Sequence, residues 1–179
     1  MNGSALGDED TAIIGTVTAS DVDGDNLSYA LATGAAPAHG SVAFNGSQYT
    51  YTPNTDFNGS DSFDVVISDG NGGTDTVTID ITVNPANDAP VGTNGAASGD
   101  EDTAITGIVA ASDVDGDSLT YALAAGGAPD HGSVSFNGSQ YTYTPDADFN
   151  GSDSFDVEIS DGNGGHRYGH HRHHRRSGQ

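Results

Sequence analysis

The sequence predicts an all-β chain of two tandem Greek-key β-sandwich domains, the second of which lacks its last strand. One observation is a repeat: GDEDTAIIGTVTASDVDGD begins at Gly7, and GDEDTAITGIVAASDVDGD begins 92 residues later at Gly99. Such a long period indicates an array of domain-sized modules. A second observation is that short alternating apolar segments are separated by turn-forming residues, with no helical period. The third is that the last strand of the first copy, TDTVTIDITV, is replaced in the second by a His- and Arg-rich tail.

Alternation of apolar and polar residues defines the strands of the first copy. In LSYAL, Leu27, Tyr29 and Leu31 share one face, while Ser28 on the other face becomes Thr120 in the second copy. The differences between the copies fall mainly at every second residue of a strand, which places them on one face. Each strand is therefore expected to have one buried and one solvent-facing side. The expected strands are residues 11–19, 26–32, 40–44, 48–53, 62–68 and 74–83. In the last of these, the inward positions are Val77, Ile79, Ile81 and Val83.

Turn-forming residues set the boundaries between these elements. FNGSQ is expected to form a hairpin, with Asn45-Gly46 supplying the positive φ angles. Two prolines in NPANDAP should stiffen the connection between the copies and keep it out of the sheets. The predicted organisation is a first repeat at 1–84, a calcium-binding linker at 85–91, a truncated second repeat at 92–165 and a tail at 166–179.

Composition excludes several functions. The chain has 26 acidic residues against four basic ones, a formal charge of −22, and all four basic residues are arginines in the tail. A polyanionic body repels phosphates, so nucleic acid is not an expected partner. There is no cysteine, which excludes disulfides and thiolate metal sites. No apolar run approaches the length of a membrane span, and the beginning of the chain does not read as a signal peptide.

Four acidic groups recur in each copy, and they are candidates for metal binding. Alternating carboxylates in a glycine-containing loop can converge on Ca²⁺, which prefers six to eight oxygen ligands. The alternative is that each Asp is a turn residue bonded to its own backbone. For DVDGD we favour calcium, because three carboxylates in five residues without a nearby cation repel one another. In the first copy the groups are DED (Asp8, Glu9, Asp10), DVDGD (Asp21, Asp23, Asp25), DFNGSD (Asp56, Asp61) and SDGNGG (Asp69).

These stretches, in this order, resemble the cadherin-like tandem repeats of very large bacterial surface adhesins. VTASDVDGDNLSYAL is similar to the cadherin D-x-D loop between two strands. DED resembles the cadherin strand-A glutamate, NDAP the Asn-Asp linker, and ISDGNGG the late Asp before the final strand. The resemblance implies Ca²⁺ between successive domains.

The resemblance also implies which residues hold calcium. At the junction within the chain these are Glu9 and Asp56 from the first repeat, Asn87 and Asp88 from the linker, and Asp113, Asp115 and Asp161 from the second repeat. Asp21, Asp23 and Asp69 would face a preceding module, and Glu101 a following one. Asp56 matches the cadherin pattern incompletely. Asp25 and Asp117 are additional to the pattern and are expected either to bind the metal or to cap the turn.

The function expected from this resemblance is a calcium-stiffened spacer or adhesion module, part of a large extracellular or cell-surface adhesin. Its expected partners are neighbouring repeats, with other cells, polysaccharide or like copies as further candidates, and no catalysis is expected. The alternative is a carbohydrate-binding module of a polysaccharide-active protein, in which Tyr29, Tyr49 and Tyr51 would stack on sugar rings. Their positions in the alternating strand pattern instead favour packing within the domain. His39 and His131 lie at equivalent positions of the two copies and are interpreted as histidines in a turn.

The tail is interpreted as the last strand of the second repeat read out of frame. With a suitable choice of codons, TDTVTIDITV read one base early gives HRYGHHRHHR, which matches residues 166–175 at every position. The tail is therefore expected to be disordered. The second repeat should then be less stable and should expose a sheet edge open to pairing.

Overall fold

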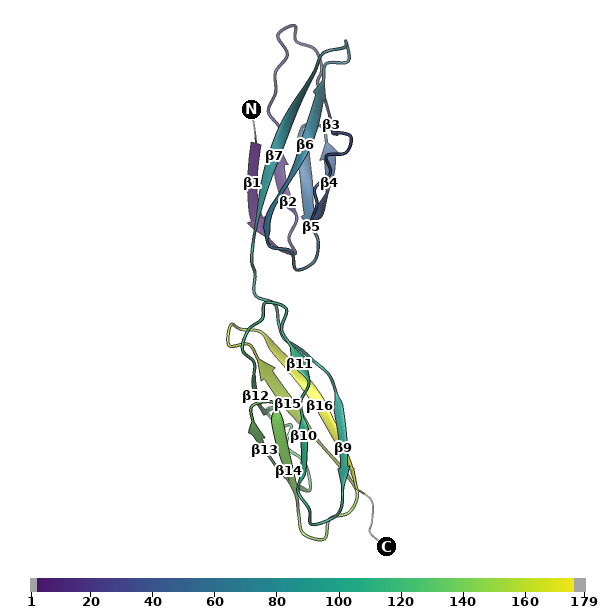
Figure 1. Ribbon diagram of the computed structural model, residues 1–179, viewed down its shortest axis with the longest axis vertical. Helices are drawn as coiled ribbons and strands as arrows, with labels where there is room; N and C mark the ends of the chain where they lie inside the picture. Colours follow the sequence, from purple (N-terminus) through teal and green to yellow (C-terminus); the bar gives the residue numbers. More distant parts are fainter. Residues whose placement is uncertain (1–2, 176–179) are drawn as a thin grey trace. The chain divides into compact units, whose positions relative to one another are not determined.

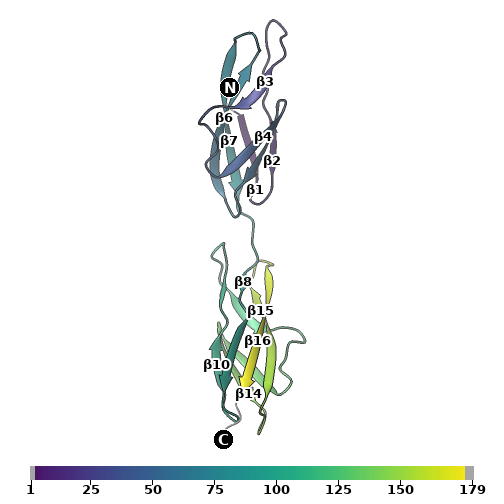
Figure 2. The same cartoon turned by 90° about the vertical axis from the view of Figure 1, so that its right-hand side faces the viewer.

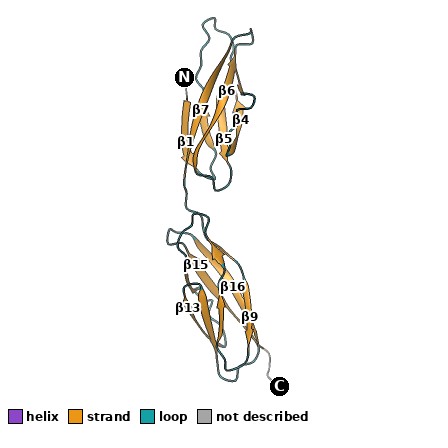
Figure 3. Cartoon of the chain, in the orientation of Figure 1, coloured by secondary structure: helices purple, strands orange, loops and turns teal. Residues whose placement is uncertain are grey.

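The structure is a computed structural model that describes residues 3–175, without the side chains of residue 170 and residues 172–175. The chain divides into two compact units, Met1–Ala86 and Asn87–Gln179. In the described residues of each unit, β-strands are the only regular secondary structure, and they form two main sheets (Figures 1 and 3). The prediction of an all-β chain with two sandwich domains is confirmed.

In unit 1 a four-stranded sheet lies against a three-stranded one. The larger sheet has the order β1-β7-β6-β3, and the smaller has the order β2-β5-β4. Only β1 runs parallel to its neighbour, pairing Gly3 with Ile79 on β7. The bounds are β1 Gly3–Asp8, β2 Ile13–Thr16, β3 Ser28–Leu31, β4 Gly40–Asn45, β5 Gln48–Pro53, β6 Gly59–Ser68 and β7 Thr74–Asn84.

Unit 2 repeats this topology and adds a short third pairing. Its sheets have the orders β12-β15-β16-β9 and β10-β14-β13, and β8 pairs with β11. The bounds are β8 Val91–Gly92, β9 Gly95–Gly99, β10 Ile105–Ile108, β11 Ala111–Ser112, β12 Thr120–Leu123, β13 Gly132–Asn137, β14 Gln140–Pro145, β15 Ser152–Ser160 and β16 His166–Arg175.

Each expected strand of the first copy is present, but β1 and its counterpart β9 were not anticipated. Their sequences, GSALGD and GAASG, have almost no apolar alternation, and Leu6 is an exposed residue in β1. What holds β1 is the parallel main-chain ladder to β7. The expected hairpin is also present, but its central residues are Gly46 and Ser47, and only Gly46 has a positive φ (61°). A positive φ at the first central residue alone is typical of a type II′ turn.

The core of unit 1 confirms the expected inward faces. Ile13, Tyr49 and Tyr51 from the small sheet are at most 4% exposed. They meet Phe63 of β6, whose ring lies edge-on to Tyr49 with the centroids 5.3 Å apart. The inward residues of β7 are all buried as predicted: Val77, Ile79, Ile81 and Val83.

Two expectations for the tail are wrong. Residues 166–175 form β16, so unit 2 does not lack its last strand and this part of the tail is ordered. β16 pairs with β15 on one side and β9 on the other, so the edge of β15 is covered rather than open. The reason is that sheet pairing uses main-chain groups, which His and Arg supply as well as Val and Ile. Residues 176–179 lie outside the described part of the chain.

The register of β16 places polar residues where β7 has apolar ones. Phe63 of β6 is paired with Ile79, and the corresponding Phe155 of β15 is paired with His171. His171 is 1% exposed, and Gly169 stands where β7 has Val77. The main-chain scaffold of the last strand is therefore kept, while part of its apolar contribution to the core is lost.

The linker is shorter than expected. Unit 1 ends at Ala86, and Val91 already belongs to β8. Figure 2 labels β8. The prolines therefore do not keep all of 85–91 out of the sheets, because Val91 pairs with Ser112. Pro90 itself is buried in unit 2.

Candidate metal-binding loops

The DVDGD loop of unit 2 brings three carboxylates together. Asp113 Oδ1 accepts hydrogen bonds from the backbone N–H groups of Asp115 (3.0 Å) and Asp117 (3.3 Å), which folds the loop around that side chain. One carboxylate oxygen from each of these three residues lies within 4.8 Å of the others. The turn therefore uses Asp113 Oδ1, and a metal ion would bind the other oxygen of the same carboxylate, Oδ2.

The second oxygen of Asp113 is the atom that the turn does not use. Asp113 Oδ2 is buried and has no hydrogen-bond partner among the described residues. A buried carboxylate oxygen without a donor costs free energy, roughly 1–3 kcal/mol or more for a charged group. A hard cation bound to this oxygen would remove that cost. The donor set of the loop, carboxylate oxygens only, is the kind that Ca²⁺ prefers.

The start of unit 2 is held against the same loop. The backbone N–H of Asp88 donates to Asp115 Oδ2 at 2.8 Å. The side-chain amide of Asn87 donates to Asp161 Oδ2 at 2.9 Å. The structure thus groups four residues that the sequence predicted as ligands: Asn87, Asp88, Asp115 and Asp161.

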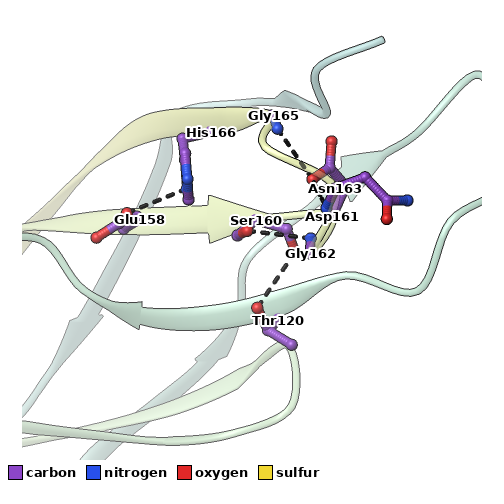
Figure 4. Close-up of polar contacts among 8 residues, drawn as sticks. All are labelled: Thr120, Glu158, Ser160, Asp161, Gly162, Asn163, Gly165 and His166. Atoms are coloured by element: carbon purple, nitrogen blue, oxygen red, sulfur yellow. Dashed lines mark hydrogen bonds and ion pairs between the residues drawn. The ribbon is translucent and has the colours of Figure 1, made fainter. Parts of the chain in front are cut away.

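Asp161 is buried in the turn between β15 and β16. Its Oδ1 accepts from the backbone N–H groups of Asn163 (2.7 Å) and Gly165 (3.0 Å), as Figure 4 shows. The Asn87 amide is the main cause that lowers the pKa of Asp161; burial opposes it, and these backbone donors add to the lowering. Asp161 is therefore anionic at neutral pH, as a calcium ligand must be.

Glu9 is a buried carboxylate at the end of unit 1. It is 2% exposed, and its Oε1 accepts from the backbone N–H of Ala86 at 2.6 Å. Its Oε2 accepts from the side-chain amide of Asn58 at 3.2 Å. Asn58 was not named as a site residue, although it lies in the DFNGSD group. Asp56 lies nearby, with its backbone N–H donating to Asp10 Oδ1 at 3.2 Å.

The other acidic loop of unit 1 repeats the turn geometry of unit 2. Asp21 Oδ1 accepts from the backbone N–H of Asp23 at 2.8 Å, and Asp69 Oδ1 accepts from those of Asn71 and Gly73. The side-chain amide of Asn71 donates to Asp25 Oδ2 at 2.8 Å.

The matching pair in unit 2 is Asn163 and Asp117, at 2.7 Å. Asp25 and Asp117 thus join the D-x-D loop to the turn that carries the late Asp. The sequence indicated that they bind the metal or cap the turn, and it gave no sign of the two Asn partners.

Glu101, the counterpart of Glu9, is exposed. Glu9 accepts a hydrogen bond from Ala86, two residues after β7, and the counterpart of Ala86 in unit 2 lies outside the described residues. Asp102 nevertheless keeps the contact of Asp10, accepting from the backbone N–H of Asp148 at 2.9 Å.

Asp61 and Asp153 have a different role from the other acidic residues. Asp61 accepts from the backbone N–H groups of Ala38 and His39 and from the hydroxyl of Tyr51. Burial raises the pKa of Asp61, but these bonds together with the Ser62 N–H outweigh burial, and the net pKa is lowered. The carboxylate therefore fastens the loop before β4 to the core.

The recurring histidines contact aromatic rings. The ring of His39 stacks on that of Phe57, with centroids 4.3 Å apart, and His131 stacks in the same way on Phe149. The backbone N–H of His39 also donates to Asp61 Oδ2 at 2.8 Å. The tyrosines considered for sugar stacking are also in packing roles, since Tyr49 and Tyr51 are buried.

Two packed sheets with one D-x-D loop in each repeat define a tandem Ig-like β-sandwich protein. The chain belongs to the bacterial Ig domain family, whose model matches residues 2–82 and 87–169. A search of curated protein sequences finds no match. The described residues include no helix that could cross a membrane.

Solved structures with similar folds include cadherin ectodomains. Drosophila N-cadherin EC1-4 is 18% identical with a TM-score of 0.58, and the match covers 98% of this chain and 48% of that one. Human mucin-like protocadherin EC1-2 is 16% identical with a TM-score of 0.50, covering 99% and 97%. An endo-fucoidan hydrolase of glycoside hydrolase family 107 is 20% identical with a TM-score of 0.41, and this chain spans 28% of its length. The cadherin likeness is one of fold.

Proposed function

We propose that the chain is a calcium-stiffened, non-catalytic spacer within an extracellular adhesin. The observation that carries the proposal is the buried Oδ2 of Asp113, which has no hydrogen-bond partner in the described part of the chain. It belongs to a cluster of three carboxylates in a chain whose four basic residues all lie beyond position 166. Bound Ca²⁺ would supply the charge that this cluster lacks.

The residues that would hold calcium belong to two groups. In unit 2 they are the loop carboxylates Asp113 and Asp115, with Asp161 and the linker residues Asn87 and Asp88. In unit 1 the group is Glu9 with Asp56. The chain itself connects the groups, since Glu9 bonds the N–H of Ala86, and Ala86 is covalently followed by Asn87. We propose that calcium takes ligands from both groups and so fixes the linker.

The same chemistry recurs at the loop of Asp21, Asp23, Asp25 and Asp69, which would take calcium together with a preceding module. Glu101 would serve a following one. The physical effect is mechanical: without the ion, the carboxylates repel one another and the linker can swivel. With the ion, an array of repeats becomes a stiff rod that holds a binding domain away from the cell.

Calorimetric titration with Ca²⁺, followed by thermal unfolding with Ca²⁺ or EGTA, tests the proposal. A hundredfold excess over the dissociation constant should add about 2.7 kcal/mol to the free energy of unfolding. Asp113→Asn should weaken binding, whereas Asp80→Asn, on the exposed side of β7, should leave it unchanged and controls for net charge. Equal binding by both variants, or no heat of binding at all, would overturn the assignment.

A further inference from the structure

The core of unit 2 contains the imidazole of His171, which lies on β16. This residue is 1% exposed. The centroid of its ring lies 5.5 Å from that of Phe155 on β15 and 5.6 Å from that of Tyr141 on β14. In unit 1 the same place is taken by Ile79, which is 2% exposed. The two cores therefore differ by a side chain that can bind a proton near neutral pH.

The main chain of β9 covers one edge of this imidazole. Gly95 pairs with His171, and a Cβ atom on Gly95 would be 2.6 Å from His171 Nδ1 and 2.8 Å from Cε1. Ile79 is enclosed in the same way, since a Cβ atom on Gly3 would be 2.7 Å from Ile79 Cδ1. In unit 2, however, the covered edge is one that a protonated ring would need to present to water or to an acceptor.

The neighbouring strands bring few ionisable groups toward His171. Tyr141 is neutral near pH 7 and below, because burial raises the pKa of its hydroxyl. β9, β10 and β13, with the sequences GAASG, ITGI and GSVSFN, have no ionisable side chain. On β16 itself, the residues of the same parity on either side are Gly169 and His173. The acidic residue on the inward side of β15 is Asp153, which the register pairs with His173.

The carboxylate of Asp153 is already engaged within the core. It accepts from the hydroxyl of Tyr143 at 2.8 Å and from three backbone N–H groups. The other acidic residues of β15, Asp156 and Glu158, alternate onto its outer side. There Glu158 Oε1 lies 3.2 Å from His166 Nδ1. The negative charges of β15 are therefore bonded to other donors or lie on the outer face of the sheet.

Protonation of His171 in this site is costly. An imidazolium among aromatic rings gives up its hydration, and burial disfavours the charged form. In the unfolded chain the same histidine is hydrated and titrates at about pH 6.5. Below that pH the unfolded state binds more protons than the folded state, so the free energy of unfolding falls as the pH falls. Above it neither state is protonated at this residue, and the contribution is constant.

We infer that His171 makes unit 2 acid-sensitive, so that unit 2 unfolds in response to mild acid while unit 1, with Ile79 in the same place, does not. One proton corresponds to a fall of up to about tenfold in the folding equilibrium constant for each pH unit below about 6.5. Calcium has no part in this effect, because Phe155, Tyr141 and Gly95 around the imidazole are not among the proposed calcium ligands.

Urea unfolding of the full chain in EGTA, followed by amide NMR between about pH 7.5 and 5.5, measures this sensitivity. The amides of Val65 and Val157, at equivalent buried positions of β6 and β15, report on the two units separately. The folding equilibrium constant of unit 2 should fall about tenfold over this range, and that of unit 1 should stay constant. Unit 1 also corrects for titration of the acidic loops, because both units contain them.

Matched variants assign the response to one residue. His171→Ile should remove it from unit 2, and Ile79→His should confer it on unit 1. His131→Gln and His166→Gln, at exposed histidines of unit 2, should leave it in place. The parent chain and His171→Ile decide the question even where Ile79→His leaves unit 1 unfolded. An equal response of the two units, a response that persists in His171→Ile, or a folded but unresponsive unit 1 in Ile79→His would overturn the inference.

Discussion

The imidazole of His171 lies against the ring of Phe155, with the centroids 5.5 Å apart and the planes inclined by 20°. In unit 1 the same place is taken by Ile79 opposite Phe63. The two units thus share a main-chain framework and differ by a titratable ring at the centre of one core. An imidazole gives up hydration when buried, and an aliphatic side chain of similar size does not.

His171→Ile should therefore stabilise unit 2 by about 1–3 kcal/mol, the range for exchanging a buried polar group for an apolar one. Calorimetric unfolding of the full chain measures this, and the transition of unit 1 serves as an internal reference. The reciprocal change Ile79→His should lower the stability of unit 1 by a similar amount. If neither transition moves, the buried histidine is not what distinguishes the two cores.

A second prediction concerns the origin of the tail. Replacing residues 166–175 by TDTVTIDITV, the sequence of residues 74–83, should raise the stability of unit 2 further, because Gly169 also regains an apolar side chain. Resequencing the gene around codon 165 tests the proposed one-base shift directly. An intact reading frame with codons unrelated to those of residues 74–83 would refute the shift, whatever the stability of the replacement.

A third prediction concerns the buried carboxylate of Asp153. It accepts from the hydroxyl of Tyr143 at 2.8 Å and from the backbone N–H groups of Asp130 and His131. Asp153→Asn would replace one acceptor oxygen by a donor that faces these groups. We expect a loss of about 2 kcal/mol from the free energy of unfolding of unit 2. Asp80→Asn, on the surface, should cost little in the same denaturant titration.

The pH dependence of stability follows from the same network. Burial raises the pKa of Asp153, but the bonds from Tyr143 and from the backbone outweigh burial, so the net pKa is lowered. A folded-state pKa below the unfolded value of about 3.9 contributes stability above that pH. This contribution is lost as the pH falls through the folded pKa. Unfolding curves between neutral pH and pH 3 should show this loss, and Asp153→Asn should reduce it.

Much of the fold could be predicted from the sequence, because alternation reveals strands that have one apolar face. Ile13 is buried and Ile14 exposed, as the differences between the copies indicated. β1 could not be found in this way, because GSALGD owes its place to a main-chain ladder with a strand more than 70 residues away. The same cause makes β16 a strand although its sequence has no apolar alternation.

The candidate site was predictable in its carboxylates but not in its amide partners. Asp113 and Asp115 could be found because alternating Asp in a glycine-containing loop has a recognisable spacing. Asn58, Asn71 and Asn163 could not, because each bonds a carboxylate more than 40 residues away in the sequence. Their contacts exist only once the sheets have paired.

Small-angle X-ray scattering of the full chain in Ca²⁺ and in EGTA tests most directly whether calcium stiffens it. The account predicts a larger maximum dimension and a narrower distribution of conformations with Ca²⁺. Glu9→Gln, which weakens the unit 1 group while keeping its shape, should reduce that difference, and Asp80→Asn should preserve it. Superimposable scattering curves of the unchanged chain in Ca²⁺ and in EGTA would contradict the central claim.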